Sequence, residues 1–358
     1  MSRVGVGVLG CGFVGAAQAH IMHSYPDVSV RAVAGGTGPS ARALAAELEC
    51  DWEDSVSGLV SRNDIDGVLI ATPSHLHAEH AMLASTHGKH VFMEMPMALS
   101  VRECDALIDS LNRNETMCML GALLHYYDGI RRGGALIEKG GIGEPYAASA
   151  AHTSWAPHPF GGWKDRRTAT GGHLFHHMHE IDLFRWWVGD ITTVFARTRS
   201  FGAPDRDDVV LVTLEFENGA LGSIEHGHGF RINARAVTIN GSQGALRVDL
   251  RESTVVYRHE GDRDEAFPLS ADEEANRSMR ALFSRANSAY GKPGVRPWPF
   301  LTAVFRHELA DFIDCLLDRQ ASPSAGWLLD PQHGRAAVAV AEAAMTSART
   351  GAPVTLRR

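Results

Sequence analysis

The sequence predicts an α/β domain with a doubly wound, mostly parallel sheet, followed by an α+β domain with a mostly antiparallel sheet. Three observations support this. Strand and helix patterns alternate as far as about Gly121, which is typical of parallel strands joined by crossover helices. Beyond that point, short β-rich runs follow one another without helices between them, which indicates antiparallel pairing. The length of 358 residues favours two domains, and we expect these to be 1–122 and 123–358, with the last helices packing back on the first.

The first domain opens with a strand, a glycine-rich turn and a helix. The continuous apolar run Val4 to Leu9 leads into Gly10-Cys11-Gly12-Phe13-Val14-Gly15 and a helical pattern from Ala16 to His23. Glycines in such a G-x-G-x-x-G turn permit a tight bend and let a pyrophosphate approach the amides at the helix N-terminus. We therefore expect a Rossmann domain whose cofactor contacts include Gly10, Gly12, Phe13, Val14 and Gly15.

The end of the second strand bears on the choice between NAD and NADP. The strand pattern Val28 to Ala34 is followed by Gly35-Gly36-Thr37-Gly38, where a dinucleotide site usually has an acidic residue that binds the ribose hydroxyls. The nearest cation is Arg42, one turn into the next helix. We expect NAD, with NADP as the alternative, and contacts from Gly36 and Thr37.

The third and fourth buried strand patterns also run into segments expected at the cofactor. Ile65 to Ala71 leads into a turn and a helix from about Ala78 to His87, and the short run His90 to Met93 precedes a proline turn. Ligands of open α/β sheets bind at the carboxyl ends of the strands. The residues expected to border the cofactor there are Thr72, Pro73, His77, Glu94 and Met95.

The remaining patterns complete the two domains. A helix from about Ser100 to Asn112 begins with a capping box formed by Ser100 and Glu103, and a strand follows at Met117 to Gly121. The runs that predict strands in the second domain are Tyr146–Trp155, Thr192–Arg199, Val209–Phe216, Ala220–Gly227, Ala234–Gly241, Ala245–Leu250 and Thr254–His259. The last helical patterns are Phe305 to Leu317 and Arg335 to Ser347.

The stretch Thr170 to Asp182, T-G-G-H-L-F-H-H-M-H-E-I-D, concentrates titratable side chains. Such groups rarely gather for packing alone, and imidazole serves proton transfer, metal binding and polar cores alike. On a continuous helix, His176 and His179 share a face, and His173 and His177 form a second such pair. We expect part of an active site here.

A divalent metal is an alternative use of the histidines. His226 and His228 would point to one side of a strand, and His152, on the first strand of the second domain, is placed to join them. Against this, the chain has no H-E-x-x-H pattern, and the ligands would have to converge from separate elements. We therefore predict no bound metal and a hydrogen-bonded histidine network instead.

Composition excludes several classes of protein. The net charge of −8 offers no basic stripe for nucleic acid. The five cysteines lack C-x-x-C spacing, which argues against a disulfide framework or a cysteine-bound zinc and fits a reducing cytoplasm. We see no signal region and no run of ~18 apolar residues, so we expect neither export nor membrane insertion.

The chain resembles the glucose–fructose oxidoreductase and inositol dehydrogenase (Gfo/Idh/MocA) family. The matching segments, in the family's order, are G-C-G-F-V-G, A-T-P-S-H-L-H, E-M-P, G-A-L-L-H-Y-Y, I-G-E-P, G-G-H-L-F-H-H-M-H-E-I-D and A-V-A-V-A-E-A-A-M-T-S-A-R-T-G-A-P-V. The resemblance implies an open-faced sheet in the second domain and homodimers or homotetramers formed through it. It also implies that a hydroxyl carbon of a sugar, inositol or related polyol is oxidised or reduced through a nicotinamide.

Two departures from the family concern catalysis. Met95 stands where the E-K-P motif has a lysine, and methionine carries no proton. Phe175 stands four residues before His179, where the family has an aspartate. The resemblance makes His179 the expected general base. Among the neighbouring residues, His176 or His177 is expected to take over the role of the missing aspartate or lysine, and Lys164 is the nearby lysine placed to replace the missing one.

Several residues are expected to bind the substrate. Tryptophan rings pack on sugar faces and cations hold hydroxyls, although packing at the domain edge explains these residues almost as well. His125 lies at the crossover between the domains, where a site wall is expected. The expected substrate-binding residues are His125, Trp155, Trp163, Arg166, His177 and Asp182.

Three functions fit the sequence. The first is an NAD(P)-dependent oxidoreductase acting on a hydroxyl carbon of a sugar, polyol or glycoside. The second is an NAD-dependent glycoside hydrolase or lyase that oxidises the sugar transiently, eliminates and returns the hydride. The third is a nicotinamide-binding protein that has lost catalysis, as the changes at Met95 and Phe175 suggest.

Overall fold

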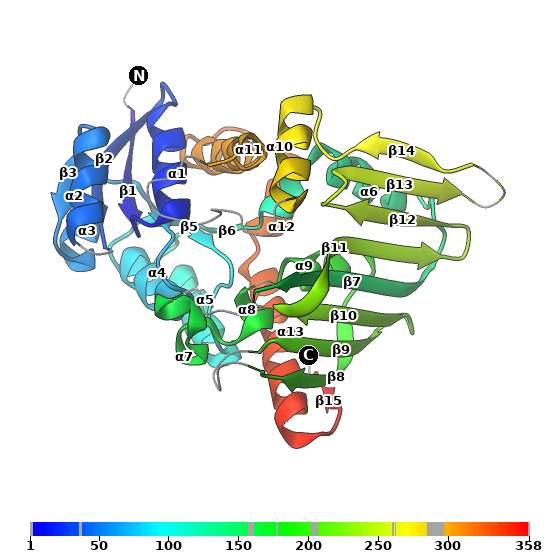
Figure 1. Cartoon of the computed structure of the whole chain (residues 1–358). Helices are drawn as coiled ribbons and strands as arrows, with labels where there is room; N and C mark the ends of the chain where they lie inside the picture. The colour runs from blue at the N-terminus through cyan, green and yellow to red at the C-terminus, as the bar shows by residue number, and fades with distance from the viewer. Residues whose placement is uncertain are drawn as a thin grey trace. The chain divides into compact units, whose positions relative to one another are not determined.

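The computed structural model describes residues 3–35, 38–156, 161–176, 178–201, 207–259, 261, 263–284 and 297–356 (Figure 1). The chain forms two compact units. The first comprises residues 1–126 and 289–335, and the second comprises 127–288 and 336–358. No helix in the described ranges is both long and apolar enough to cross a membrane.

A six-stranded parallel sheet forms the centre of the first unit. Its order is β3-β2-β1-β4-β5-β6, and the strands are β1 (Val4–Leu9), β2 (Val28–Ala34), β3 (Asp51–Glu53), β4 (Gly67–Ile70), β5 (His90–Glu94) and β6 (Cys118–Gly121). Every residue of β1 is buried, as expected for a strand that pairs on both sides and is covered on both faces. The predicted doubly wound sheet is confirmed.

The helices of the first unit connect and follow these strands. They are α1 (Phe13–His23), α2 (Gly38–Glu47), α3 (Val56–Val60), α4 (His77–Thr86), α5 (Val101–Arg113), α11 (Pro299–Leu316) and α12 (Pro323–Leu328), with short 3-10 turns η1 (Ser74–Leu76) and η2 (Leu123–Tyr126). The predicted cap of α5 is confirmed. The Ser100 hydroxyl accepts a hydrogen bond from the Glu103 amide at 3.3 Å, and the Glu103 carboxylate accepts one from the Leu99 amide at 3.1 Å.

A nine-stranded sheet forms the centre of the second unit. Its order is β14-β13-β12-β11-β7-β10-β9-β8-β15, with strands β7 (Pro145–Trp155), β8 (Ile191–Arg199), β9 (Val209–Phe216), β10 (Leu221–Gly227), β11 (Gly229–Gly241), β12 (Gly244–Asp249), β13 (Thr254–His259), β14 (Glu265–Pro268) and β15 (Val354–Thr355). Only β7 and β10 pair in parallel among these described strands, so the predicted mostly antiparallel sheet is confirmed.

One face of this sheet is buried beneath helices. Along β10, Gly222, Ile224 and His226 are buried while the residues between them are exposed, which is the period of two expected for a sheet covered on one side. The helices of this unit are α6 (Asp128–Glu138), α7 (Arg167–Thr170), α8 (His173–His176), α9 (His179–Trp187), α10 (Glu273–Ser284) and the later part of α13 (Pro331–Thr350), with the 3-10 turn η3 (Gly162–Asp165). Phe184 of α9 packs against Phe216 of β9, with ring centroids 6.1 Å apart, so α9 lies on the buried face.

The histidine-rich stretch is not one helix. Gly171 and Gly172 adopt positive φ values of 76° and 108°, which end α7 before α8 begins. The helix α8 stops at His176, and α9 starts afresh at His179. The described residues thus place His176 and His179 in two different helices rather than one continuous helix, and because the side chain of His176 lies outside the described part of the chain, a shared face stays a prediction.

Candidate active site

The glycine-rich turn after β1 has the geometry of a dinucleotide cradle. A Cβ at Gly10 would lie 2.5 Å from the Ala71 carbonyl oxygen, and one at Gly15 only 1.9 Å from the Gly10 oxygen, so both positions require glycine. A Cβ at Gly12 would meet no atom within 4 Å. Gly12 is also the N-cap of α1, where it offers no side chain to the first helical amides. The open backbone at a helix N-terminus fits a pyrophosphate.

Other residues expected at the cofactor are held in a buried network at the ends of the parallel strands. The two ring nitrogens of His77 lie 2.7 Å from the Thr72 carbonyl and 2.8 Å from the Pro96 carbonyl. Burial lowers the pKa of His77, so the neutral ring donates to only one of these carbonyls at a time. The Thr72 hydroxyl lies 3.1 Å from Nδ1 of His80. His77 thus holds the carbonyl groups of Thr72 and Pro96 in place on either side of its ring.

Not every predicted cofactor residue is placed. Phe13 is buried, and Val14, Pro73 and Met95 are half-buried. Gly36 and Thr37 lie outside the described residues. Contact of any of these residues with the cofactor stays a prediction.

Glu94, at the end of β5, is half-buried and influences a second carboxyl group, that of Glu308, a relationship that the sequence did not reveal. Its Oε1 accepts a hydrogen bond from the Gln18 side chain at 2.5 Å, and burial raises the pKa of Glu94 to about 7. Glu308 of α11 is fully buried, and burial together with the nearby Glu94 raises the pKa of Glu308 well above its usual range. We expect both carboxyls to hold protons at mildly acidic pH.

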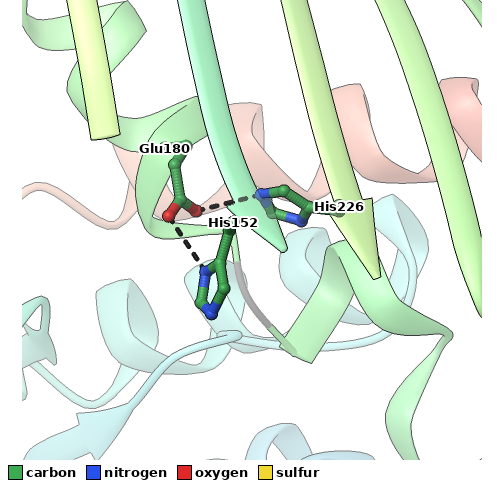
Figure 2. Close-up of side chains that lie close together, drawn as sticks. All are labelled: His152, Glu180 and His226. Carbon is green, nitrogen blue, oxygen red and sulfur yellow. Dashed lines mark hydrogen bonds and ion pairs between the residues drawn. The ribbon is translucent and has the colours of Figure 1, made fainter. Parts of the chain in front are cut away.

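In the second unit, one carboxylate lies between two imidazoles. His152 of β7 and His226 of β10 are direct partners in the parallel register, and Glu180 of α9 reaches both (Figure 2). Glu180 Oε1 lies 3.0 Å from His152 Nδ1, and Oε2 lies 3.2 Å from His226 Nε2. All three side chains are buried.

The electrostatics of this trio favour an ionised Glu180 carboxylate beside a neutral His152 imidazole. Burial, with the charge of Arg235, lowers the pKa of His152 to about 3. Burial by itself would raise the pKa of Glu180, but the two histidines outweigh it and hold that pKa well below its usual range. At neutral pH we therefore expect an ionised Glu180 carboxylate beside a neutral His152 imidazole.

Two more histidines adjoin the trio. The ring centroid of His173 lies 5.5 Å from that of His226 and 4.6 Å from that of His228, and the Ser154 hydroxyl lies 2.6 Å from Nδ1 of His228. We call His152, His173, His226, His228 and Glu180 the histidine cluster. The sequence raised the convergence of His152, His226 and His228 only as an alternative, and it gave no signal that Glu180 lies among them.

The expected catalytic residues are only partly described. His179 is the first residue of α9 and directly precedes Glu180, and Asp182 is buried one turn further along. The side chain of His176 and the whole of His177 lie outside the described part of the chain. Phe175, in place of the family's aspartate, packs on Gly171, where a Cβ would lie 2.5 Å from its ring.

The expected substrate-binding residues are not all gathered in one unit. Trp155, at the end of β7, lies under the Arg231 guanidinium at 4.1 Å. Trp163 and Lys164 form part of η3, and Arg166 follows it. Desolvation lowers the pKa of Lys164, although the residue as a whole is exposed. His125 belongs to the first unit, where it is fully buried and stacks on Trp327 with centroids 6.4 Å apart.

Comparison with known proteins gives consistent matches along the chain. Residues 4–122 match the model described as "Oxidoreductase family, NAD-binding Rossmann fold", and residues 135–356 match "Oxidoreductase family, C-terminal alpha/beta domain", both of the Gfo/Idh/MocA type. The 2,7-anhydro-N-acetylneuraminate hydratase of Mediterraneibacter gnavus is 29% identical over 97% of this chain and 95% of its own. The levoglucosan dehydrogenase of Pseudarthrobacter phenanthrenivorans is 26% identical over 84% of this chain and 85% of its own.

A solved structure matches the fold. The structure of a levoglucosan dehydrogenase in complex with NADH superposes with a TM-score of 0.82 and 22% identity, and it covers 100% of both chains. At this identity the likeness shows the fold alone.

Proposed function

Because the chain belongs to the Gfo/Idh/MocA family and is an NAD-dependent oxidoreductase by that membership, we propose that it oxidises a hydroxyl carbon of a sugar, polyol or glycoside, with His179 as the general base. The observation that carries the proposal is the histidine cluster, which sets several imidazoles, among them the neutral His152, around an ionised carboxylate in a chain that also has a dinucleotide cradle. NADP stays an alternative cofactor.

The chemistry needs a hydride acceptor, a base and groups that orient the hydroxyl. Bound NAD supplies the acceptor. A neutral imidazole can take the hydroxyl proton, and a nearby carboxylate stabilises the imidazolium that results. We assign the first role to His179, from its place in the family's motif, whereas Glu180, whose two oxygens pair with His152 and His226, would stabilise positive charge within the histidine cluster. Either Lys164 or His176 would hold the developing alkoxide in place of the lysine that Met95 replaces.

The substrate residues of this proposal are those expected from the sequence. Trp155 and Trp163 would pack on the sugar face, and the polar residues would hold hydroxyl groups. These polar residues are His125, Arg166, His177 and Asp182. We further propose that residues 1–122 hold the cofactor and that residues 123–358 supply most substrate contacts.

A redox-neutral reaction is the second candidate. A relative that spans nearly the whole chain is named a hydratase, and adding water to a substrate consumes no net oxidant. Transient oxidation of a sugar hydroxyl would acidify the adjacent C–H, allow elimination or addition, and end with return of the hydride. Such a sequence needs several proton-transfer groups near one sugar, and the histidine cluster would supply them.

Product analysis separates these candidates. Purified protein is incubated with NAD and a panel of free sugars, polyols, glycosides and anhydro sugars, while NADH and sugar products are both measured. NADH equal to product indicates a dehydrogenase, and product without net NADH indicates the redox-neutral reaction. Binding of NAD with neither outcome across the panel would overturn both candidates and leave a nicotinamide-binding protein without catalysis.

We also propose a homodimer or homotetramer formed through the second unit's sheet. Tyr146, Leu211 and Leu221 are 59%, 45% and 61% exposed on the neighbouring strands β7, β9 and β10. Exposed apolar side chains on adjacent strands favour association. Light scattering of the wild-type chain and of Leu221→Asp tests this, and a monomeric wild type would exclude it.

A further inference from the structure

We propose that His152, Glu180 and His226 form a binding site for a divalent transition metal of the Zn²⁺ or Co²⁺ class. The three ligands come from β7, α9 and β10, so the fold brings together residues that are distant in the sequence (Figure 2). The site's existence does not depend on the proposed reaction.

The distances between donor atoms are close to those of a tetrahedral site. Glu180 Oε1 lies 3.0 Å from His152 Nδ1, and Oε2 of the same carboxylate lies 3.2 Å from His226 Nε2. One donor atom from each of the three residues lies within 4.8 Å of the other two. Ligands about 2.0–2.1 Å from a tetrahedral zinc are separated from each other by about 3.3 Å. Each imidazole is thus already at about this separation from one oxygen of the carboxylate, and binding would draw both imidazoles toward the same ion.

Buried polar atoms here lack the partners that an ion would supply. Glu180 Oε2 and both ring nitrogens of His226 are buried, and no described residue meets them with hydrogen-bond geometry, even though Oε2 and Nε2 are only 3.2 Å apart. Glu180 is 2% exposed and His226 is 0% exposed, so an unsatisfied carboxylate oxygen is expensive there. A cation between Oε2 and Nε2 would satisfy both atoms.

The donor set selects the kind of metal. Two imidazoles and one carboxylate suit Zn²⁺ or Co²⁺, whereas Ca²⁺ and Mg²⁺ need mostly oxygen ligands. Arg235 of β11 is the register partner of His152 of β7, and its positive charge repels a bound cation. This repulsion further disfavours ions that are held by charge alone. His173, whose ring centroid is 5.5 Å from that of His226, is the nearest further imidazole for a fourth position, and water is the alternative.

Metal binding here changes the tautomer of His152. Without a metal, Nδ1 of the neutral ring donates to the Glu180 carboxylate, and with a metal on Nδ1 the ring's single proton would lie on Nε2 instead. A metal at this position would offer a Lewis acid to a substrate hydroxyl in a chain where Met95 replaces the family's lysine. That consequence rests on the proposed function.

Cobalt titration tests the site without NAD or sugar. Full-length protein is treated with chelator, dialysed and titrated with Co²⁺ while its visible spectrum is recorded, and Zn²⁺ binding is measured by calorimetry. We expect saturation near one equivalent per chain and the intense visible bands of four-coordinate cobalt. Glu180→Gln and His226→Asn should each weaken binding at least ~10-fold, while His259→Ala, a histidine of β13 in the same sheet, should bind like wild type.

Two results would overturn the proposal. One is the absence of a saturable cobalt spectrum in the wild-type protein, and the other is wild-type affinity in Glu180→Gln. Circular dichroism checks that each variant folds. If Glu180→Gln and His226→Asn both fail to fold, His152→Asn takes their place, and unchanged affinity in that variant would overturn the ligand assignment.

Discussion

The Glu180 carboxylate lies 3.0 Å from Nδ1 of His152, and both side chains are buried between a helix and a strand of the second unit. The pair resembles the carboxylate–imidazole arrangement that fixes a histidine tautomer in many enzymes. Here it connects α9, which carries His179, to the adjacent strands β7 and β10. The protonation of His152 and Glu180 is therefore expected to affect the free energy of unfolding as well as the proposed reaction.

This pair predicts loss of stability in acid. In the unfolded chain a histidine gains a proton near its ordinary pKa of 6.5, whereas His152 in the folded protein does so only near 3. The folded state then binds fewer protons than the unfolded state, so the free energy of unfolding falls as pH falls through this window. The loss from His152 should be about 2 kcal/mol between about pH 6.5 and about pH 5. Urea unfolding at several pH values measures it. His152→Asn should show a shallower slope, and equal slopes would contradict this account.

The glycine cradle predicts that two nearby substitutions affect different properties: one weakens NAD binding, and the other lowers stability. Gly12→Ala places a methyl group where no atom lies within 4 Å, so the protein should melt like wild type but bind NAD at least ~10-fold more weakly. Gly15→Ala forces a carbon to 1.9 Å from the Gly10 oxygen and should lower the melting temperature by itself. Gly326→Ala, with equal free space in α12, is the control; it should leave NAD affinity unchanged and should not lower the melting temperature. Undiminished NAD affinity in Gly12→Ala would place the cofactor elsewhere.

The buried carboxyls predict the reverse pH dependence in the first unit. Glu308 retains its proton to a higher pH than the usual 4.5, so its contribution to stability is present at low pH and is lost as pH rises through its folded pKa. Glu308→Gln mimics the protonated form and should stabilise the cofactor-free protein at alkaline pH, with the difference vanishing near pH 4. The exposed Glu79→Gln serves as the control. A gain of the same size at all pH values would rule out ionisation as its cause.

Much of the fold follows from local sequence patterns. The apolar runs predicted β1 and β2 with the bounds that the structure shows, and the capping box at Ser100 correctly predicted where α5 begins. The short strands β3 and β15 were not predicted, because two or three residues carry too little periodicity.

The site was harder to predict because its contacts are long-range. The trio depends on the register between β7 and β10 and on the helix breaks at Gly171 and Gly172, which local spacing does not reveal. The pairing of Glu94 with Glu308 likewise depends on a C-terminal helix belonging to the first unit. Residue types indicated the chemistry, whereas the fold determined which residues meet.

The base assignment predicts a specific kinetic effect. His179→Ala should lower turnover by about 10² or more, because a general base commonly contributes that much, while NAD affinity stays unchanged. His259→Ala should retain wild-type turnover. Turnover in His179→Ala within a few-fold of wild type would remove His179 from this role.

The central claim is that a hydride leaves a sugar hydroxyl carbon for bound NAD. Rapid mixing of the enzyme–NAD complex with a substrate found in the panel, monitored at the absorbance band of reduced nicotinamide, tests it most directly. We predict that this band appears before or with product, and more slowly when the reacting carbon carries deuterium, whether the net reaction is oxidation or redox-neutral. Product formation while the nicotinamide stays oxidised throughout, with no isotope effect, would contradict the account.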